Sequence, residues 1–273
     1  AQPGRWLGWH AGAEPGRSAV KLVHQTTPWR WALAGVLLGL VLSTVLFAPA
    51  RWVSALVQQA SRGQVLLMEA RGTVWAGSAR VTLTGGAGSQ ETATLPGRLA
   101  WTLAPALVGA QLQLNADCCM QQAWVMQLLP HWNGLQLRLS DAQSQWPAKL
   151  LMGLGTPWNT LQPQGDLHLS TQGLTLAWAT GRLLLTGAAE LDAMNLSSHL
   201  STLRPMGSDR FSLKGGTPVT LALTTLQGSL QISGSGQWVG GQLRFNGEAT
   251  AAPQHQAALA NLLNLIGRRN GAR

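Results

Sequence analysis

The sequence predicts a mainly β protein, in which a single N-terminal transmembrane helix precedes an antiparallel, curved or partly closed β-sheet domain with one or two short helices. Residues 31–50 carry no charge, and the chain after them repeats short units in which apolar and polar residues alternate. Charged residues make up only 11% of the 273 residues, against about a quarter in ordinary domains, while glycine occurs 32 times. This composition is typical of many short strands joined by tight turns.

Residues 1–29 are expected to form a disordered cytoplasmic tail, because they are rich in glycine, proline and polar residues. Residues 30–51 are expected to form the transmembrane helix. The uncharged part runs from Trp31 to Ala50, and at a rise of about 1.5 Å per residue it spans about 30 Å, the hydrocarbon thickness of a bilayer. Trp52 lies two residues after its end, where aromatic rings favour the membrane interface. We therefore take Trp31 and Ala50 as the limits of the membrane anchor.

Basic residues indicate the orientation of this anchor. More lysine and arginine residues precede the apolar segment than closely follow it, which favours a cytoplasmic N-terminus. The small-residue sequence Ala48-Pro49-Ala50 also resembles the end of a cleavable signal peptide, which is the alternative interpretation. We favour an uncleaved anchor, because the apolar stretch is longer than the roughly 7–15 residues of a signal-peptide core.

The remaining residues, 52–273, are expected to form one β-rich domain. In the segment GLQLRL, residues 134–139, leucine alternates with polar residues, as in a strand with one buried face. A glycine at the start of each such unit permits a tight turn or a bulge, and repeated hairpins of this kind imply an antiparallel sheet. Similar units occur at 97–103, 109–114, 165–170, 173–178, 181–187, 228–233 and 240–245.

Short helices are expected to interrupt or cover the sheet. Residues 147–155 have proline early and glycine late, as a short helix prefers. Residues 257–269 place apolar side chains at helical spacing, which predicts a C-terminal helix that caps the sheet or, as the alternative, lies on the membrane surface. Residues 53–60 are expected to extend the first helix a little, and residues 121–129 fit a helix and a strand equally well.

No arrangement of side chains predicts an enzyme, a metal site or a cofactor. The six histidines are at least fourteen residues apart, and the nearest acidic pair, Glu190 and Asp192, is explained by a solvated strand face. The net charge is +9, but the basic residues are scattered rather than gathered in a patch. Scattered charge argues against nucleic-acid binding and fits attraction to anionic lipid headgroups better.

The cysteines and the tryptophans of the domain are interpreted first as structural. Cys118 and Cys119 are adjacent, and in a strand their side chains would point to opposite faces, so the simplest reading is two small buried residues. Pairing in an oxidising compartment is the alternative. The tryptophans stand next to small residues at strand-like positions, which favours core packing over a partner-facing aromatic row. They are Trp75, Trp101, Trp178 and Trp238.

Short motifs that follow the anchor resemble, in their order and spacing, protein N of the type II secretion system, the general secretion pathway protein N family, over residues 29–267. The first is the segment GTVWAG, 72–77, and Asp209 stands where the family tends to have an aromatic residue. The residues taken as family motifs are Gly72, Thr73, Trp75, Gly77, Gly97, Trp101, Pro105, Pro205, Gly207, Gly228, Trp238 and Gly247.

This resemblance implies an accessory, single-pass component of the inner membrane of a Gram-negative envelope, with a cytoplasmic N-terminus and a periplasmic domain. Such a component would support export of folded periplasmic proteins across the outer membrane by docking to other secretion components and to membrane lipid. It implies no enzymatic activity, no cofactor and no nucleic-acid partner. A more distant resemblance, to the β-groove domains of envelope lipid-transport proteins, gives the alternative of a periplasmic lipid-binding domain with a lipid ligand.

Overall fold

The computed structural model describes residues 29–86, 89, 91–179, 182–239 and 242–266. The expected cytoplasmic tail therefore lies outside the described residues, apart from Trp29. The chain divides into two compact units between Ser43 and Thr44, and each is described by itself.

Helix α1, Trp29–Leu46, is long and apolar enough to cross a membrane, and none of its residues is buried. It ends four residues before Ala50, the predicted limit of the anchor. The difference has a local cause, since Ala50 donates a backbone hydrogen bond to Gly72 at 3.0 Å and Ala48 accepts one from Val74 at 2.8 Å. Both alanines are buried and belong to the domain, and a proline between them cannot donate the next helical hydrogen bond.

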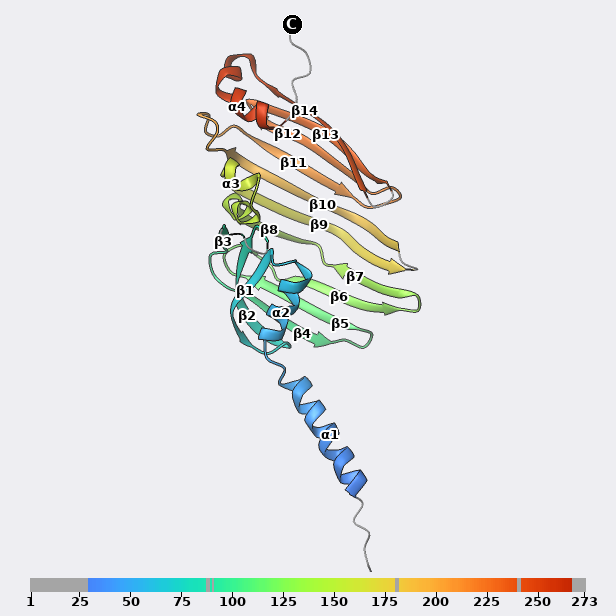
Figure 1. Ribbon diagram of the computed structural model, residues 1–273. Coiled ribbons are helices and arrows are strands. Elements are labelled where there is room, and N and C mark those ends of the chain that lie inside the picture. The colour runs from blue at the N-terminus through green and yellow to red at the C-terminus, as the bar shows by residue number, and fades with distance from the viewer. Residues whose placement is uncertain (1–28, 87–88, 90, 180–181, 240–241, 267–273) are drawn as a thin grey trace, which may run out of the picture. The chain divides into compact units, whose positions relative to one another are not determined.

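The second unit is built on one antiparallel sheet of fourteen strands within the described residues (Figure 1). Its hydrogen-bonded order is β1-β2-β4-β5-β6-β7-β9-β10-β11-β12-β13-β14, while β3 pairs with β2 and β8 pairs with β9. The sheet is open, so β1 and β14 are its outermost strands. The strands are β1 Val65–Gly72, β2 Ala76–Thr84, β3 Thr92–Thr94, β4 Leu99–Pro105, β5 Ala110–Ala116, β6 Trp124–His131, β7 Gly134–Leu139, β8 Ala142–Pro147, β9 Gln164–Ala179, β10 Arg182–Ser197, β11 Gly207–Lys214, β12 Thr220–Gly228, β13 Leu230–Val239 and β14 Gln242–Ala251.

The alternation in the sequence becomes one apolar and one polar face in the sheet. Across β4 to β7, Leu103 faces Leu112, Leu112 faces Met126, and Met126 faces Leu139. Side chains that are directly opposite in neighbouring strands share a face, so these four form a continuous apolar row. The antiparallel, mainly β architecture that the sequence predicts is thereby confirmed.

Short helices pack on the apolar face at one end of the strands. The segment 147–155 contains the 3-10 helix η1, while the segment 121–129, which fitted helix and strand equally, contains most of β6. The predicted C-terminal helix begins at Gln256 in the structure, and its predicted residues 267–269 lie outside the described residues. The helices are α2 Arg51–Ala60, η1 Ala148–Leu154, α3 Trp158–Leu161, η2 Pro253–His255 and α4 Gln256–Ile266.

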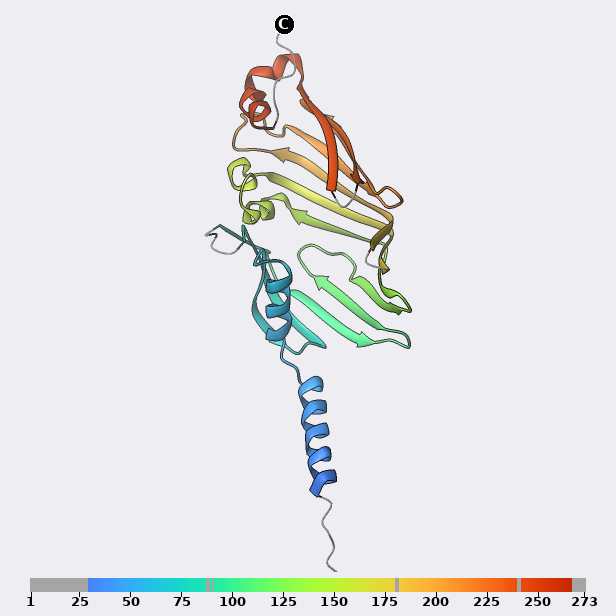
Figure 2. The ribbon, with the colours of Figure 1, turned by 45° about the vertical axis from the view of Figure 1, so that its right-hand side comes forward.

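The buried core follows these helices. Leu150 of η1 packs with Leu95 and Ala116, and Leu259 of α4 packs with Met206 and nearby leucines. We call this end of the strands the helix-covered end, and the opposite end, where the β4–β5, β6–β7, β9–β10, β11–β12 and β13–β14 hairpins turn, the turn end. Figure 2 shows η1, α3 and α4 on one side of the sheet and these hairpin turns on the other.

Candidate interaction surfaces

The motif GTVWAG, residues 72–77, forms the corner between β1 and β2. Gly72 and Gly77 are direct partners in the ladder, and Thr73 closes the turn by accepting a hydrogen bond from the backbone of Ala76 at 3.1 Å. The indole of Trp75 donates to the carbonyl of Val45 at 2.8 Å. This corner therefore holds residues 45–50, the segment through which the chain enters the sheet domain.

Trp101 of β4 packs beneath the corner and explains why position 77 is glycine. The indole of Trp101 is only 5% exposed and donates to the carbonyl of Val74 at 3.1 Å. A Cβ atom on Gly77 would lie 2.5 Å from the Trp101 ring and 2.8 Å from the carbonyl oxygen of Arg71. Only glycine therefore allows the corner to lie directly against the ring.

The second motif lies beneath helix α4. Gly207 faces Gly228 across β11 and β12, and the backbone of Met206 bonds to both Leu196 and Ser229. Gly228 has φ +139° and approaches the backbone of the neighbouring strand so closely that a side chain would not fit. Pro205 directly precedes this junction. The motif thus closes the strands against which α4 packs.

Asp209, where the family resemblance expects an aromatic residue, is a buried carboxyl group at this junction. Burial raises its pKa, and a hydrogen bond that Thr225 donates at 2.6 Å opposes the rise.

Asp192 is the direct ladder partner of Arg210, next to the pair of Ala193 and Asp209. Two hydrogen bonds from Arg210, both 2.6 Å, lower the pKa of Asp192. The predicted solvated pair of acids is thus held by an arginine, which also lies 3.6 Å from Glu190.

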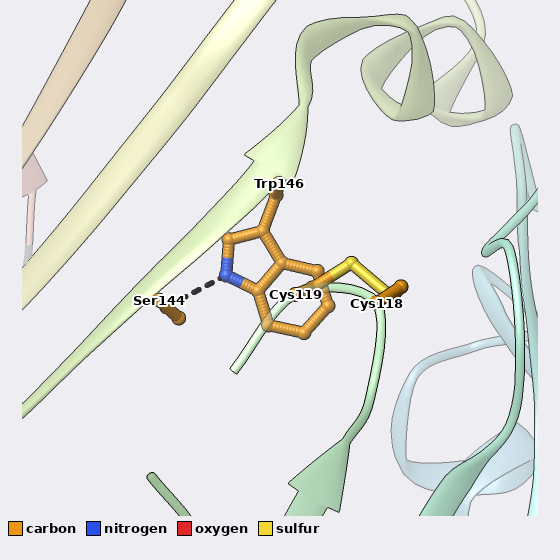
Figure 3. Close-up of a disulfide and its surroundings, with 4 residues drawn as sticks. All are labelled: Cys118, Cys119, Ser144 and Trp146. Atoms are coloured by element: carbon orange, nitrogen blue, oxygen red, sulfur yellow. Dashed lines mark hydrogen bonds between the residues drawn. A yellow bond between two sulfur atoms is a disulfide. The ribbon is translucent and has the colours of Figure 1, made fainter. Parts of the chain in front are cut away.

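The two cysteines form a disulfide in the turn between β5 and β6 (Figure 3). Strand β5 ends at Ala116, so the opposite-face geometry that the sequence interpretation assumed does not apply. Cys119 is buried against the core next to Trp146, but Cys118 is exposed, which corrects the expectation of two buried residues. The pair borders a polar depression of about 500 Å³ that also contains His168. Among the described residues, no group of three side chains is placed to hold a metal ion.

The remaining motif residues lie at strand ends and turns. Gly97 has a positive φ in the turn that leads into β4, and Pro105 ends that strand. Gly247 of β14 faces Gly234 of β13, and the ring of Phe245 lies against both glycines. Their functional meaning stays a prediction, since the structure gives only their positions in the backbone.

Two of the four tryptophans expected in the core are exposed instead. Trp101 is buried and Trp75 half-buried, but Trp178 is 45% and Trp238 is 36% exposed. Both exposed rings lie at the turn end, beyond the reach of the helices. The sequence analysis also missed Trp132, although an apolar residue inside a two-residue turn between alternating segments is a signal that could have identified it.

The first edge of the sheet is protected. Strand β1 has a register shift between Met68 and Arg71, and Glu69 between them has a positive φ. Glu69 forms ion pairs with Arg80 at 3.0 Å and Arg98 at 3.3 Å, and α2 packs against the strand. A bulge, ion-paired charges and a covering helix each hinder the addition of another strand.

The last edge is long and open. Strand β14 has ten residues, and its first seven are exposed. Its register against β13 has no shift, and the backbone N–H of Ala252 donates to Ser229 across the same ladder. Because antiparallel partners alternate in direction, the N–H groups of every second residue point away from β13. These residues are Leu243, Phe245, Gly247 and Ala249.

The comparison with known families matches the sheet domain as a whole. The sequence model of the family described as "Type II secretion system (T2SS), protein N" matches residues 63–273, a range that contains every described strand and both motif junctions. No curated protein and no solved structure matches the chain. With the match covering well over half of its length, the chain belongs to the type II secretion system protein N family.

Proposed function

We propose that this family member is an accessory component of the type II secretion system, anchored in the inner membrane by α1 and docked to another component through the free edge of β14. The family match supports the secretion role, and it brings no support for the alternative of a lipid-binding domain. The family is one of secretion components, so we assign the chain no enzymatic reaction.

The open edge of β14 is the observation that carries the docking proposal. An edge strand presents unpaired backbone donors and acceptors that a strand of a partner can join. Among the described strands, only β1 and β14 end the hydrogen-bonded order, and β1 is bulged and covered. Strand β14 carries two charged residues, Arg244 and Glu248, which leaves most of its length free of charges that would repel an added strand.

The membrane part of the proposal rests on α1. Its 18 residues, of which only Arg30 is charged, meet the length needed for a span, and the corner at 72–77 fixes the segment that follows. The bias in basic residues supports a cytoplasmic N-terminus and a periplasmic domain. Protease added to spheroplasts should degrade the domain, and protection of the domain would contradict this orientation.

The docking role can be tested in cells that lack the gene, by measuring the fraction of a type II substrate that reaches the medium. Ala249→Pro removes an outward-pointing N–H without removing a bond to β13. We expect it to fail to restore export, while the control Ala249→Val, which keeps the donor, restores it. Full export without the gene would contradict the secretion role, and full restoration by Ala249→Pro would contradict docking through β14.

A further inference from the structure

Five hairpins have their closing strand ends at the same end of the sheet. The register aligns them, because Ala110 faces Leu128 and Gly134 faces Ala179 across neighbouring strands. Figure 1 shows the ends of these strands along one side of the sheet. The closing pairs are Pro105–Ala110, His131–Gly134, Ala179–Arg182, Lys214–Thr220 and Val239–Gln242.

In two of these hairpins, with turns at residues 106–109 and 132–133, the outermost residues are apolar and uncovered. Leu107 is fully exposed, Trp132 is 98% exposed and Val108 is 60% exposed. Turns are usually built from glycine, proline and short polar residues, so large apolar side chains at their tips are not explained by turn formation. They contact nothing that would stabilise the domain by burial.

A second tier of apolar residues lies directly behind the tips. Leu135 faces Trp178 and Trp178 faces Leu183 across β7, β9 and β10, and each of the three is exposed. Trp238 faces Leu243 in the last hairpin, with both side chains exposed as well. The turn end thus presents aromatic and aliphatic groups along several hairpins rather than in one compact patch.

The charges at this end have one sign. Lys214 and Arg244 are exposed beside their turns, and Arg138 is exposed four residues along β7 from its turn. None of the three forms an ion pair within the described part of the chain. All nine acidic residues in the described part of the chain lie elsewhere. The segments without an acidic residue are 103–112, 126–138, 174–186, 213–221 and 236–245.

We propose that the turn end of the sheet binds the surface of an anionic phospholipid bilayer. Tryptophan rings favour the boundary between headgroups and acyl chains, exposed leucine and valine side chains enter it, and arginine and lysine meet the phosphates. A bilayer matches the arrangement better than a protein does, because it offers a flat anionic surface to tips that stand about 10 Å apart, two strand spacings.

The test uses the full chain in vesicles, with a fluorescent label placed at either end of β6. Asn133→Cys puts the label in the turn beside Trp132, and Ala123→Cys puts it at the helix-covered end. The native disulfide leaves no free cysteine, so each variant is labelled at one site. Quenchers attached to lipid then report which end touches the bilayer.

In vesicles that contain phosphatidylglycerol, the label at residue 133 should be quenched severalfold more than the label at residue 123. Changing Arg138, Lys214 and Arg244 together to glutamine should reduce that difference, and so should the double variant Leu107→Ser, Trp132→Ser, which alters only exposed side chains and leaves unfolding unchanged. Equal quenching at the two positions overturns the proposal, as does its absence at residue 133 in a folded chain. If the label at residue 133 is quenched as strongly in vesicles of phosphatidylcholine alone as in vesicles with phosphatidylglycerol, the assignment to anionic lipid is overturned.

Discussion

The two ends of the same strands differ in what covers them. At the helix-covered end, Leu259 of α4 is completely buried and Leu150 of η1 nearly so, whereas Leu107 and Trp132 at the turn end have almost no neighbours. Burial of apolar surface is the main favourable contribution to folding, so the stability of the domain is concentrated at one end. The other end can therefore present apolar residues to a partner without weakening the fold.

The difference between the two ends is tested most directly by changing a leucine to alanine at each end. Leu259→Ala should reduce the free energy of unfolding by about 2–5 kcal/mol, because it leaves a cavity between α4 and the sheet. Leu107→Ala, the matched control, removes the same atoms from a fully exposed turn and should change stability by less than about 0.5 kcal/mol. Denaturant unfolding of the full chain in detergent, followed by tryptophan fluorescence, measures both. Similar losses for the two variants would contradict the division into a covered and a bare end.

The corner at 72–77 should depend on close packing in the same way. Gly77→Ala places a methyl group against the ring of Trp101 and the backbone of Arg71, and overpacking of this kind costs about 1–3 kcal/mol. Gly35→Ala in α1 adds the same methyl group where nothing lies within 4 Å, so it should leave unfolding of the domain unchanged. An unaltered midpoint for Gly77→Ala would mean that Trp101 moves freely and that the corner is not a rigid junction.

Local pattern predicted the strands well, because alternation is a property of neighbouring residues. The segment 134–139 was predicted as a strand from its sequence alone and forms β7 with those limits. Which apolar residues are covered could not be predicted in this way. Trp101 and Trp178 have similar local sequences, but Trp101 lies beneath β1 and α2 and Trp178 does not. Burial depends on contacts between distant segments, which periodicity does not reveal.

The candidate interaction surfaces could not be predicted from the sequence for the same reason. Strand β14 is free because it comes last in the order of the described strands, and that order is a property of the whole domain. The end of helix α1 also depends on a distant contact, since Ala50 continues the apolar run in sequence but bonds to Gly72 in space. In contrast, the apolar turn residues Leu107 and Trp132 could have been recognised from their place between alternating segments.

The smallest expected effects on stability concern two carboxyl groups on opposite faces of the sheet at the helix-covered end. The two effects have opposite signs. Burial raises the pKa of Asp209 in the folded protein, so ionisation of this carboxyl costs stability as the pH rises from the unfolded value of about 3.9 through the folded pKa. Asp209→Asn keeps an acceptor for Thr225 and avoids that cost. We expect the variant to gain stability relative to the native chain as the pH increases towards neutrality.

Asp192, on the exposed face, should respond in the other direction. Its pKa is lowered by the hydrogen bonds from Arg210, so its contribution is present above about pH 3.9, the unfolded value, and is lost as the pH falls through the folded pKa. Asp192→Asn should therefore destabilise the protein near neutral pH, and by no more than about 1 kcal/mol because water screens the 37% exposed arginine. Unfolding measured across this pH range should show the two differences diverging as the pH rises. If both variants shift in the same direction, the two carboxyl groups share one environment and the apolar face is open to water at this end as well.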